Sequence, residues 1–175
     1  MNGEYPQRKN MRHPKFDYSY PGTFFITICT KDKKCLLSSI VKKESEVYPE
    51  VILTDFGVIA DKYIKQLNDF YDNLYVRLYV IMPNHIHLIL QINRTVEMND
   101  IIVPEHIPVK SSKISLFIST FKRFCNKEYG ENICQSRSFD HVIRNEFDYA
   151  ECVKYIKNNP RKWYYTYHPD EKIRN

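Results

Sequence analysis

The sequence has no long apolar run, few glycines and no paired cysteines. No stretch approaches the ~18 apolar residues that a membrane span needs, and residues 1–15 are polar, so we expect neither a span nor a secretory signal. There are no internal repeats and no low-complexity tract. The five cysteines contain no CxxC pair, which argues against a disulfide scaffold and a cysteine-rich zinc site. We therefore expect a cytoplasmic protein.

The abundance of basic and aromatic residues is compatible with binding to nucleic acid. The 175 residues fit one compact domain. Lys and Arg number 26 against 21 acidic residues, and 14% of the chain is aromatic. Basic residues neutralise phosphates and aromatic faces stack on unpaired bases, so this balance permits single-stranded nucleic acid. A net charge of +5 also occurs on proteins that bind no nucleic acid, and most aromatic residues belong in a core.

Hydrophobic periodicity predicts strands and helices in a recognisable order. Short β-branched and aromatic runs predict strands over 23–29, 74–81, 85–92 and 139–143. Apolar residues recurring every three or four positions predict helices over 55–70, 112–129 and 148–158, the third ended by Pro160. The second and third strands should pair as an antiparallel hairpin across Met82-Pro83-Asn84. The order is typical of an α+β fold, ferredoxin-like or RRM-like, with an antiparallel sheet and helices packed on one face.

The distribution of charged residues and prolines divides the chain into three segments. Residues 1–22 form a basic N-terminal arm in this division, because four basic residues outnumber two acidic residues there. An unstructured tail explains this segment equally well. Residues 23–163 form the folded domain, and residues 164–175 a C-terminal tail.

His85 and His87 begin the third predicted strand. Side chains alternate along a strand, so the two imidazoles point the same way, about 7 Å apart, while Ile86 and Leu88 point into the core. Such a pair can share a metal ion; two histidines hydrogen-bonded at a sheet surface are the alternative. With no cysteine to complete a closed site, two nitrogen ligands with room for oxygens suit Mg²⁺ or Mn²⁺ acting on phosphate.

Tyr155 and Asn159 lie four residues apart in the third predicted helix, on the border of its apolar side. A tyrosine can act as a nucleophile once its proton is removed or a cation polarises the phosphorus that it attacks. A tyrosine whose ring packs at the helix edge with its hydroxyl in water is the alternative, because thirteen other tyrosines compete for the role.

Three separated motifs, in this order, resemble one protein family: YVIMPNHIHLIL, FDHVIRNEFDY and KYIKNNPRKW. The opening FDYSYPGTFFITICTKDKKCL is similar to the start of the same family. The family is the REP-associated tyrosine transposases, members of the HUH superfamily of single-strand DNA nucleases, and the resemblance runs from about residue 8 to residue 163. It implies that residues 23–163 are an HUH transposase-like catalytic domain, with the catalytic helix near the C-terminus.

The resemblance also implies roles for individual residues. His85 and His87 match the metal ligands, Tyr155 the catalytic tyrosine, and Asn159 the polar residue that supplies a third ligand to Mg²⁺ or Mn²⁺. Three positions depart from the family: Gln is found in related branches where Asn159 stands, Cys134 replaces a usual Trp, and no Gly precedes Phe121-Lys122. His141 and Arg144 lie in a family motif and are interpreted as structural or DNA-contacting.

The activity implied is that of a metal-dependent single-stranded DNA endonuclease and strand transferase that forms a 5′-phosphotyrosine at hairpin-forming repeat elements. The setting implied is the bacterial cytoplasm, in association with the nucleoid, with single-stranded or hairpin DNA as partner, no membrane, and a monomer or homodimer. The expected DNA-contacting residues are Arg12, Lys122, Arg123, Arg144, Lys154, Lys157 and Arg161. For each basic cluster, a solvated helix face is the alternative.

Two other functions stay open at this point. One is a catalytically silent DNA-hairpin binder on the same fold, against which the intact His85, His87 and Tyr155 argue. The other is a phosphohydrolase that uses metal and water, which would cleave DNA without a protein adduct.

Overall fold

The computed structural model describes residues 21–93 and 112–169, so most of the predicted basic arm, including Arg12, lies outside it. Its centre is an antiparallel sheet of four strands in the order β4-β5-β1-β6. The strands are β1 (Gly22–Cys29), β4 (Leu74–Met82), β5 (His85–Ile92) and β6 (Phe139–Ile143). Two strands that are far apart in the sequence, β1 and β5, are central neighbours, as in the ferredoxin-like fold. The predicted fold class is confirmed.

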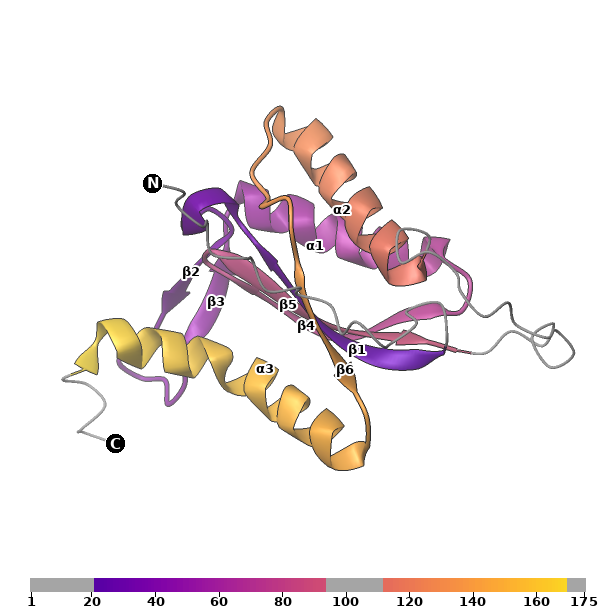
Figure 1. Ribbon diagram of the computed structural model, residues 1–175. Coiled ribbons are helices and arrows are strands. Elements are labelled where there is room, and N and C mark those ends of the chain that lie inside the picture. Colours follow the sequence, from indigo (N-terminus) through magenta and orange to yellow (C-terminus); the bar gives the residue numbers. More distant parts are fainter. Residues whose placement is uncertain (1–20, 94–111, 170–175) are drawn as a thin grey trace, which may run out of the picture.

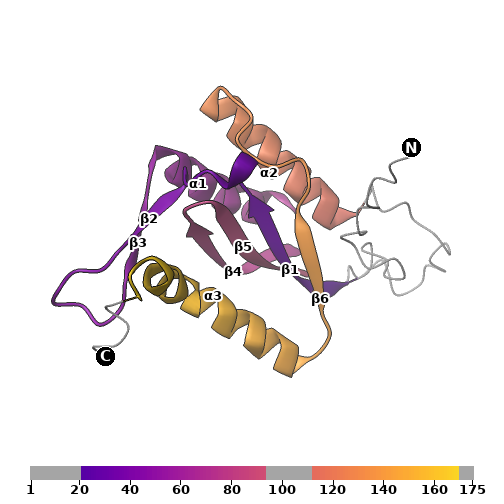
Figure 2. The same cartoon turned by 60° about the vertical axis from the view of Figure 1, so that its left-hand side comes forward.

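The helices cover both faces of this sheet. Helices α1 (Asp55–Phe70) and α2 (Lys113–Tyr129) pack together on one face, and α3 (Glu146–Tyr167) crosses the other (Figures 1 and 2). The expectation of helices on one face therefore holds for α1 and α2 and has to be corrected for α3. The reason is that the central strand β5 is buried on both sides, so the second face also needs a cover.

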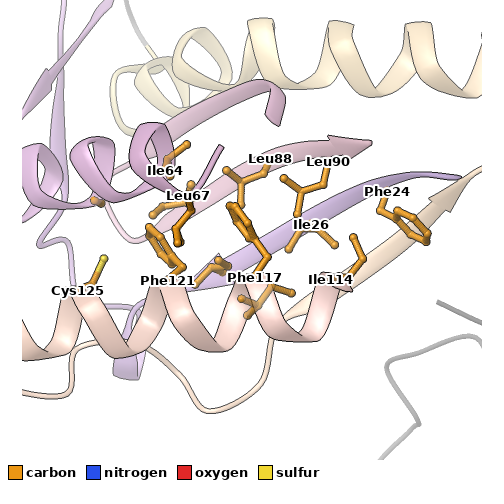
Figure 3. Packing of buried hydrophobic residues seen from close by; sticks show 14 of the residues in the cluster. Phe24, Ile26, Ile64, Leu67, Leu88, Leu90, Ile114, Phe117, Phe121 and Cys125 are labelled. Atoms are coloured by element: carbon orange, nitrogen blue, oxygen red, sulfur yellow. The ribbon is translucent and has the colours of Figure 1, made fainter. Parts of the chain in front are cut away.

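The main core lies between the sheet and the α1–α2 layer. Alternate residues of β1, namely Phe24, Ile26 and Ile28, point into this layer and are fully buried. They meet Phe117 and Phe121 from α2 (Figure 3). Both helices begin at side-chain caps: the Thr54 side chain accepts from a backbone N–H of α1, and Ser112 does the same for α2.

Helix α3 is longer than the sequence indicated. The expected end before Pro160 is wrong, because the helix continues through Pro160 to Tyr167. An interior proline removes one hydrogen bond and costs a helix about 3 kcal/mol. Tyr164 and Tyr165, beyond the proline, are both buried, and burial of large side chains at about 1.5–3 kcal/mol each offsets that cost. Residues 164–167, assigned above to a tail, are thus helical.

A second, two-stranded sheet consists of β2 (Ser38–Val41) and β3 (Glu50–Leu53), and a short 3₁₀ turn, Lys31–Lys33, precedes it. The loop of this hairpin reaches α3, where the Arg161 guanidinium lies 5.5 Å from the ring centroid of Tyr48. Within the described ranges, no helix has the length and apolar character needed to cross a membrane.

Candidate active site

The strand that carries the two histidines starts from a fixed turn. Pro83 and Asn84 form the two-residue connection between β4 and β5. The carbonyl oxygen of Pro83 accepts from the backbone N–H of Leu37 at 2.9 Å, and that of Asn84 accepts from the backbone N–H of Thr30, also at 2.9 Å. Because both carbonyls are held by neighbouring segments, the first residue of β5, His85, has a defined position.

His85 and His87 lie on the α3 face, with ring centroids 4.5 Å apart. The Nδ1 atom of His87 lies 2.9 Å from the Thr27 hydroxyl on the adjacent strand. The Nδ1 atom of His85 lies 2.7 Å from the side-chain oxygen of Asn84. Because Nδ1 of each ring has a protein partner, both rings are oriented, an arrangement typical of metal-binding histidines.

The Nε2 atom of His87 is suited to bind a metal ion. His87 is 5% exposed, and its Nε2 atom is buried without a hydrogen-bond partner in the described part of the chain. Buried polar atoms nearly always have a partner, so an orphaned imidazole nitrogen indicates a site for something that the chain does not supply.

Both histidines are in the protonation state that binds metal. Burial, reinforced by the nearby His85, lowers the pKa of His87 to about 3. Burial also lowers the pKa of His85 to about 4, against the opposing effect of a hydrogen bond with Asn159. Both rings are therefore neutral near pH 7, which leaves a nitrogen lone pair for coordination.

Helix α3 brings two further predicted residues to this pair. Asn159 is 7% exposed and its side chain hydrogen-bonds to His85. One turn earlier, Tyr155 has its ring centroid 5.2 Å from that of His87, and the side chain remains 46% exposed. The structure thus places His85, His87, Asn159 and Tyr155 together, with the tyrosine open to a large substrate and the two histidines beneath α3.

The predicted DNA-contacting residues lie on different surfaces. Lys154, Lys157 and Arg161 are exposed on α3, and Arg144 is exposed just before it. Arg123 is exposed on α2, and α2 lies across the sheet from α3 (Figure 1). The first four lie on or next to the helix that carries Tyr155, whereas Arg123 lies on a different helix.

Lys122 has a structural position instead. Its ammonium donates to the backbone carbonyls of Gln135 at 2.8 Å and Ser136 at 3.3 Å. Burial lowers its pKa. The ammonium group of Lys122 is thus hydrogen-bonded to the loop that precedes β6. These hydrogen bonds argue against a contact between Lys122 and a phosphate. Sequence patterns could not predict this contact, because a lysine next to a buried aromatic residue in a helix usually points into solvent.

His141 links β6 to the start of α3. Its Nε2 atom lies 2.9 Å from both carboxylate oxygens of Asp148, which also accepts from the backbone N–H of Arg144 at 3.1 Å. The hydrogen bond from His141 lowers the pKa of Asp148. Together with the Cys152 thiol, these side chains form a second group whose ligand atoms lie within 4.8 Å of one another and could hold a metal ion. The four-residue spacing of Asp148 and Cys152 was the available signal for it.

Comparisons with known proteins concern the fold of the chain. No family model matches the sequence. Over 167 residues, covering 89% of each chain, it is 28% identical to an uncharacterized protein of Haemophilus influenzae. A solved structure of a REP-associated tyrosine transposase bound to a REP hairpin superposes with a TM-score of 0.57 at 22% identity. That match covers 86% of this chain and 74% of the transposase.

This chain has the fold of a REP-associated tyrosine transposase. The likeness to the transposase includes the four-stranded sheet and the C-terminal helix that carries Tyr155.

Proposed function

We propose that the protein belongs to the REP-associated tyrosine transposases and is a metal-dependent single-stranded DNA endonuclease and strand transferase. The observation that carries this proposal is the exposed Tyr155 ring beside His87, whose Nε2 atom is buried and without a partner in the described residues. A merely structural histidine pair would have its inward nitrogens satisfied by the protein. The motifs that resemble the family and the shared fold support the same conclusion.

The chemistry follows from the groups at the site. Mg²⁺ or Mn²⁺ held by His85, His87 and Asn159 would polarise the scissile phosphate and stabilise the charge that grows on it. The Tyr155 oxygen attacks the phosphorus in line, and its proton is released. The bond from phosphorus to the 3′ oxygen breaks, and this oxygen leaves as a 3′ hydroxyl after taking up a proton. The 5′ end stays on Tyr155 as a phosphodiester, so a 3′ hydroxyl can later reverse the step without ATP.

The substrate we propose is hairpin-forming DNA. The structural relative is bound to a REP hairpin, and Arg144, Lys154, Lys157 and Arg161 are exposed at or beside α3 of this chain. Basic side chains in such positions can contact the phosphates of a strand that leads from a stem to the tyrosine. We place the protein in the bacterial cytoplasm with the nucleoid, acting as a monomer or a homodimer.

The test is covalent capture of labelled DNA. The full chain is incubated with Mn²⁺ or Mg²⁺ and 3′-labelled stem-loop oligonucleotides from its own genome, and the mixture is resolved on a denaturing gel. We expect a labelled protein band that requires the metal, that is absent in Tyr155→Phe, and that persists in the matched control Tyr149→Phe, an exposed tyrosine of the same helix.

Each other outcome points to a different function. Metal-dependent cleavage without a labelled protein band would indicate attack by water and a phosphohydrolase. Tight hairpin binding with no cleavage under any metal condition, unchanged in Tyr155→Phe, would indicate the silent DNA-hairpin binder.

A further inference from the structure

A cavity of about 480 Å³ opens directly beside Tyr155. It lies on the Phe25 side of the tyrosine, and the Phe25 ring centroid is 5.8 Å from that of Tyr155 and 5.0 Å from that of His87. Its size is in the range of pockets that hold small organic ligands. The lining residues are Phe25, Glu151, Cys152, Lys154, Tyr155, Asn158 and Lys162.

The cavity is lined by the aromatic ring of Phe25 and by positively charged lysine side chains. Lys154 and Lys162 lie eight residues apart on α3, about 12 Å along the helix axis, so they occupy different ends of the cavity. Glu151 lies 3.7 Å from Lys154 and offsets part of its charge. Lys162 has no acidic partner among the residues that the structure describes. An anion that enters the cavity would therefore be attracted most strongly toward Lys162.

We propose that this cavity holds the nucleotide joined to the scissile phosphate, with its base stacked on Phe25 and its outer phosphate at Lys162. This inference rests on the proposed function, because it places the scissile phosphate at Tyr155. A DNA strand whose phosphate lies there must continue away from the tyrosine. The cavity is an opening directly beside the tyrosine, because Tyr155 and Phe25 both line it. Stacking on an aromatic ring tolerates every base, so this position would be bound without being read.

A thermodynamic cycle tests the stacking contact. The cleavage position is first mapped with the wild-type chain, and the affinity for uncleaved oligonucleotide is then measured by fluorescence anisotropy with Tyr155→Phe and Mn²⁺. An abasic site at one nucleotide next to the mapped phosphate should weaken binding about 10-fold, and Phe25→Leu should weaken binding to the normal oligonucleotide about equally. With the abasic oligonucleotide, Phe25→Leu should cause almost no further loss.

The cycle separates stacking from structural damage. If Phe25→Leu only disturbed the packing of His87, its loss would be the same with normal and abasic DNA, and the proposal would be wrong. Phe147→Leu is the matched control, because Phe147 is exposed on α3 and does not line the cavity, and it should leave the affinity unchanged.

The phosphate contact is tested by salt dependence. Removing one contact to single-stranded DNA lowers the steepness of the plot of log affinity against log salt by about 0.7. We expect this change in Lys162→Gln and none in Lys65→Gln, where the lysine lies on α1 and pairs with Asp61. Equal slopes in Lys162→Gln and the parent would overturn this contact.

The failure of the cavity proposal differs from the failure of the proposed function. If the covalent adduct forms and no abasic position beside the mapped phosphate alters affinity, the cavity does not hold that nucleotide, and the nuclease stands. If no adduct forms and no position can be mapped, the proposed function is wrong, and the cavity proposal is wrong with it.

Discussion

The two faces of the central sheet have opposite characters. Under α1 and α2, β1 and β5 contribute only apolar side chains, such as Phe24, Ile26 and Leu88, and all are buried (Figure 3). Under α3, the intervening residues of the same strands include Thr27, His85 and His87, and the helix above them leaves Tyr155 exposed. Because side chains alternate along a strand, neighbouring residues contribute to one face or the other. We call the face under α1 and α2 the closed face and the face under α3 the open face. One face can thus vary its chemistry while the other maintains the fold.

The largest effect should come from two phenylalanines that are adjacent in β1 and point to opposite faces. Phe24 is 0% exposed in the core, so Phe24→Ala should lower the free energy of unfolding by about 3–5 kcal/mol. Phe25 is only partly buried, beside Tyr155, so Phe25→Ala should cost about 1 kcal/mol. Urea unfolding of the metal-free variants measures both values.

Equal losses for Phe24→Ala and Phe25→Ala would show that α3 packs on the sheet as tightly as α1 and α2 do. The open face would then have to open before a DNA strand could reach Tyr155.

Sequence patterns were sufficient for the closed face and for part of the open one. Helix 55–70 and strand 85–92 have the predicted bounds, because the apolar residues that define their periods are buried in the core. The end of α3 was missed, because Pro160 is a local signal and the burial of the tyrosines that follow it is a tertiary effect.

For the open face, the functional residues could be predicted from the sequence, but the residues that contact them could not. His85, His87, Tyr155 and Asn159 were identified from motifs, and the structure brings them together. The Thr27 contact and the cavity beside Phe25 come from strand pairing and helix placement, which no single segment encodes. Charge alone was also a poor guide for Lys122, whose ammonium turned out to be bound to backbone carbonyls.

A smaller effect should separate orientation from stability on the open face. Thr27→Val removes the hydroxyl that lies 2.9 Å from Nδ1 of His87 and keeps the shape of the side chain. Loss of a group that orients a metal-binding histidine weakens metal binding about 10- to 100-fold. We expect that loss for Mn²⁺ in isothermal titration calorimetry. Thr23→Val, on the same face of β1 and away from the histidines, should bind Mn²⁺ like the wild type. If Thr27→Val bound Mn²⁺ with unchanged affinity, the contact with Thr27 would not be what orients His87 for metal binding.

The smallest effect concerns the polar link that attaches α3 to the open face. The hydrogen bond from His141 lowers the pKa of Asp148 below its usual 3.8, so the ionised carboxylate is stabilised by folding. That contribution is fully present above pH 3.8 and is lost as the pH falls through the lower, folded-state pKa. For a solvent-accessible group in a first helical turn it should be about 0.3–1 kcal/mol. Asp148→Asn should therefore be less stable than the wild type by this amount at pH 6, and the difference should shrink in acid.

A double-mutant cycle identifies the partner in this link. In a His141→Gln background, Asp148→Asn should cost less than it does in the wild type, because the contact between Nε2 and the carboxylate is already gone. Urea midpoints at pH 6 and pH 3 give the four values needed at each pH. If the cost of Asp148→Asn were the same in both backgrounds, the carboxylate would stabilise α3 through the backbone N–H of Arg144 and the helix terminus alone. The attachment of α3 would then depend on its own first turn and not on β6, and the open face would be held to the sheet more loosely than its polar contacts indicate.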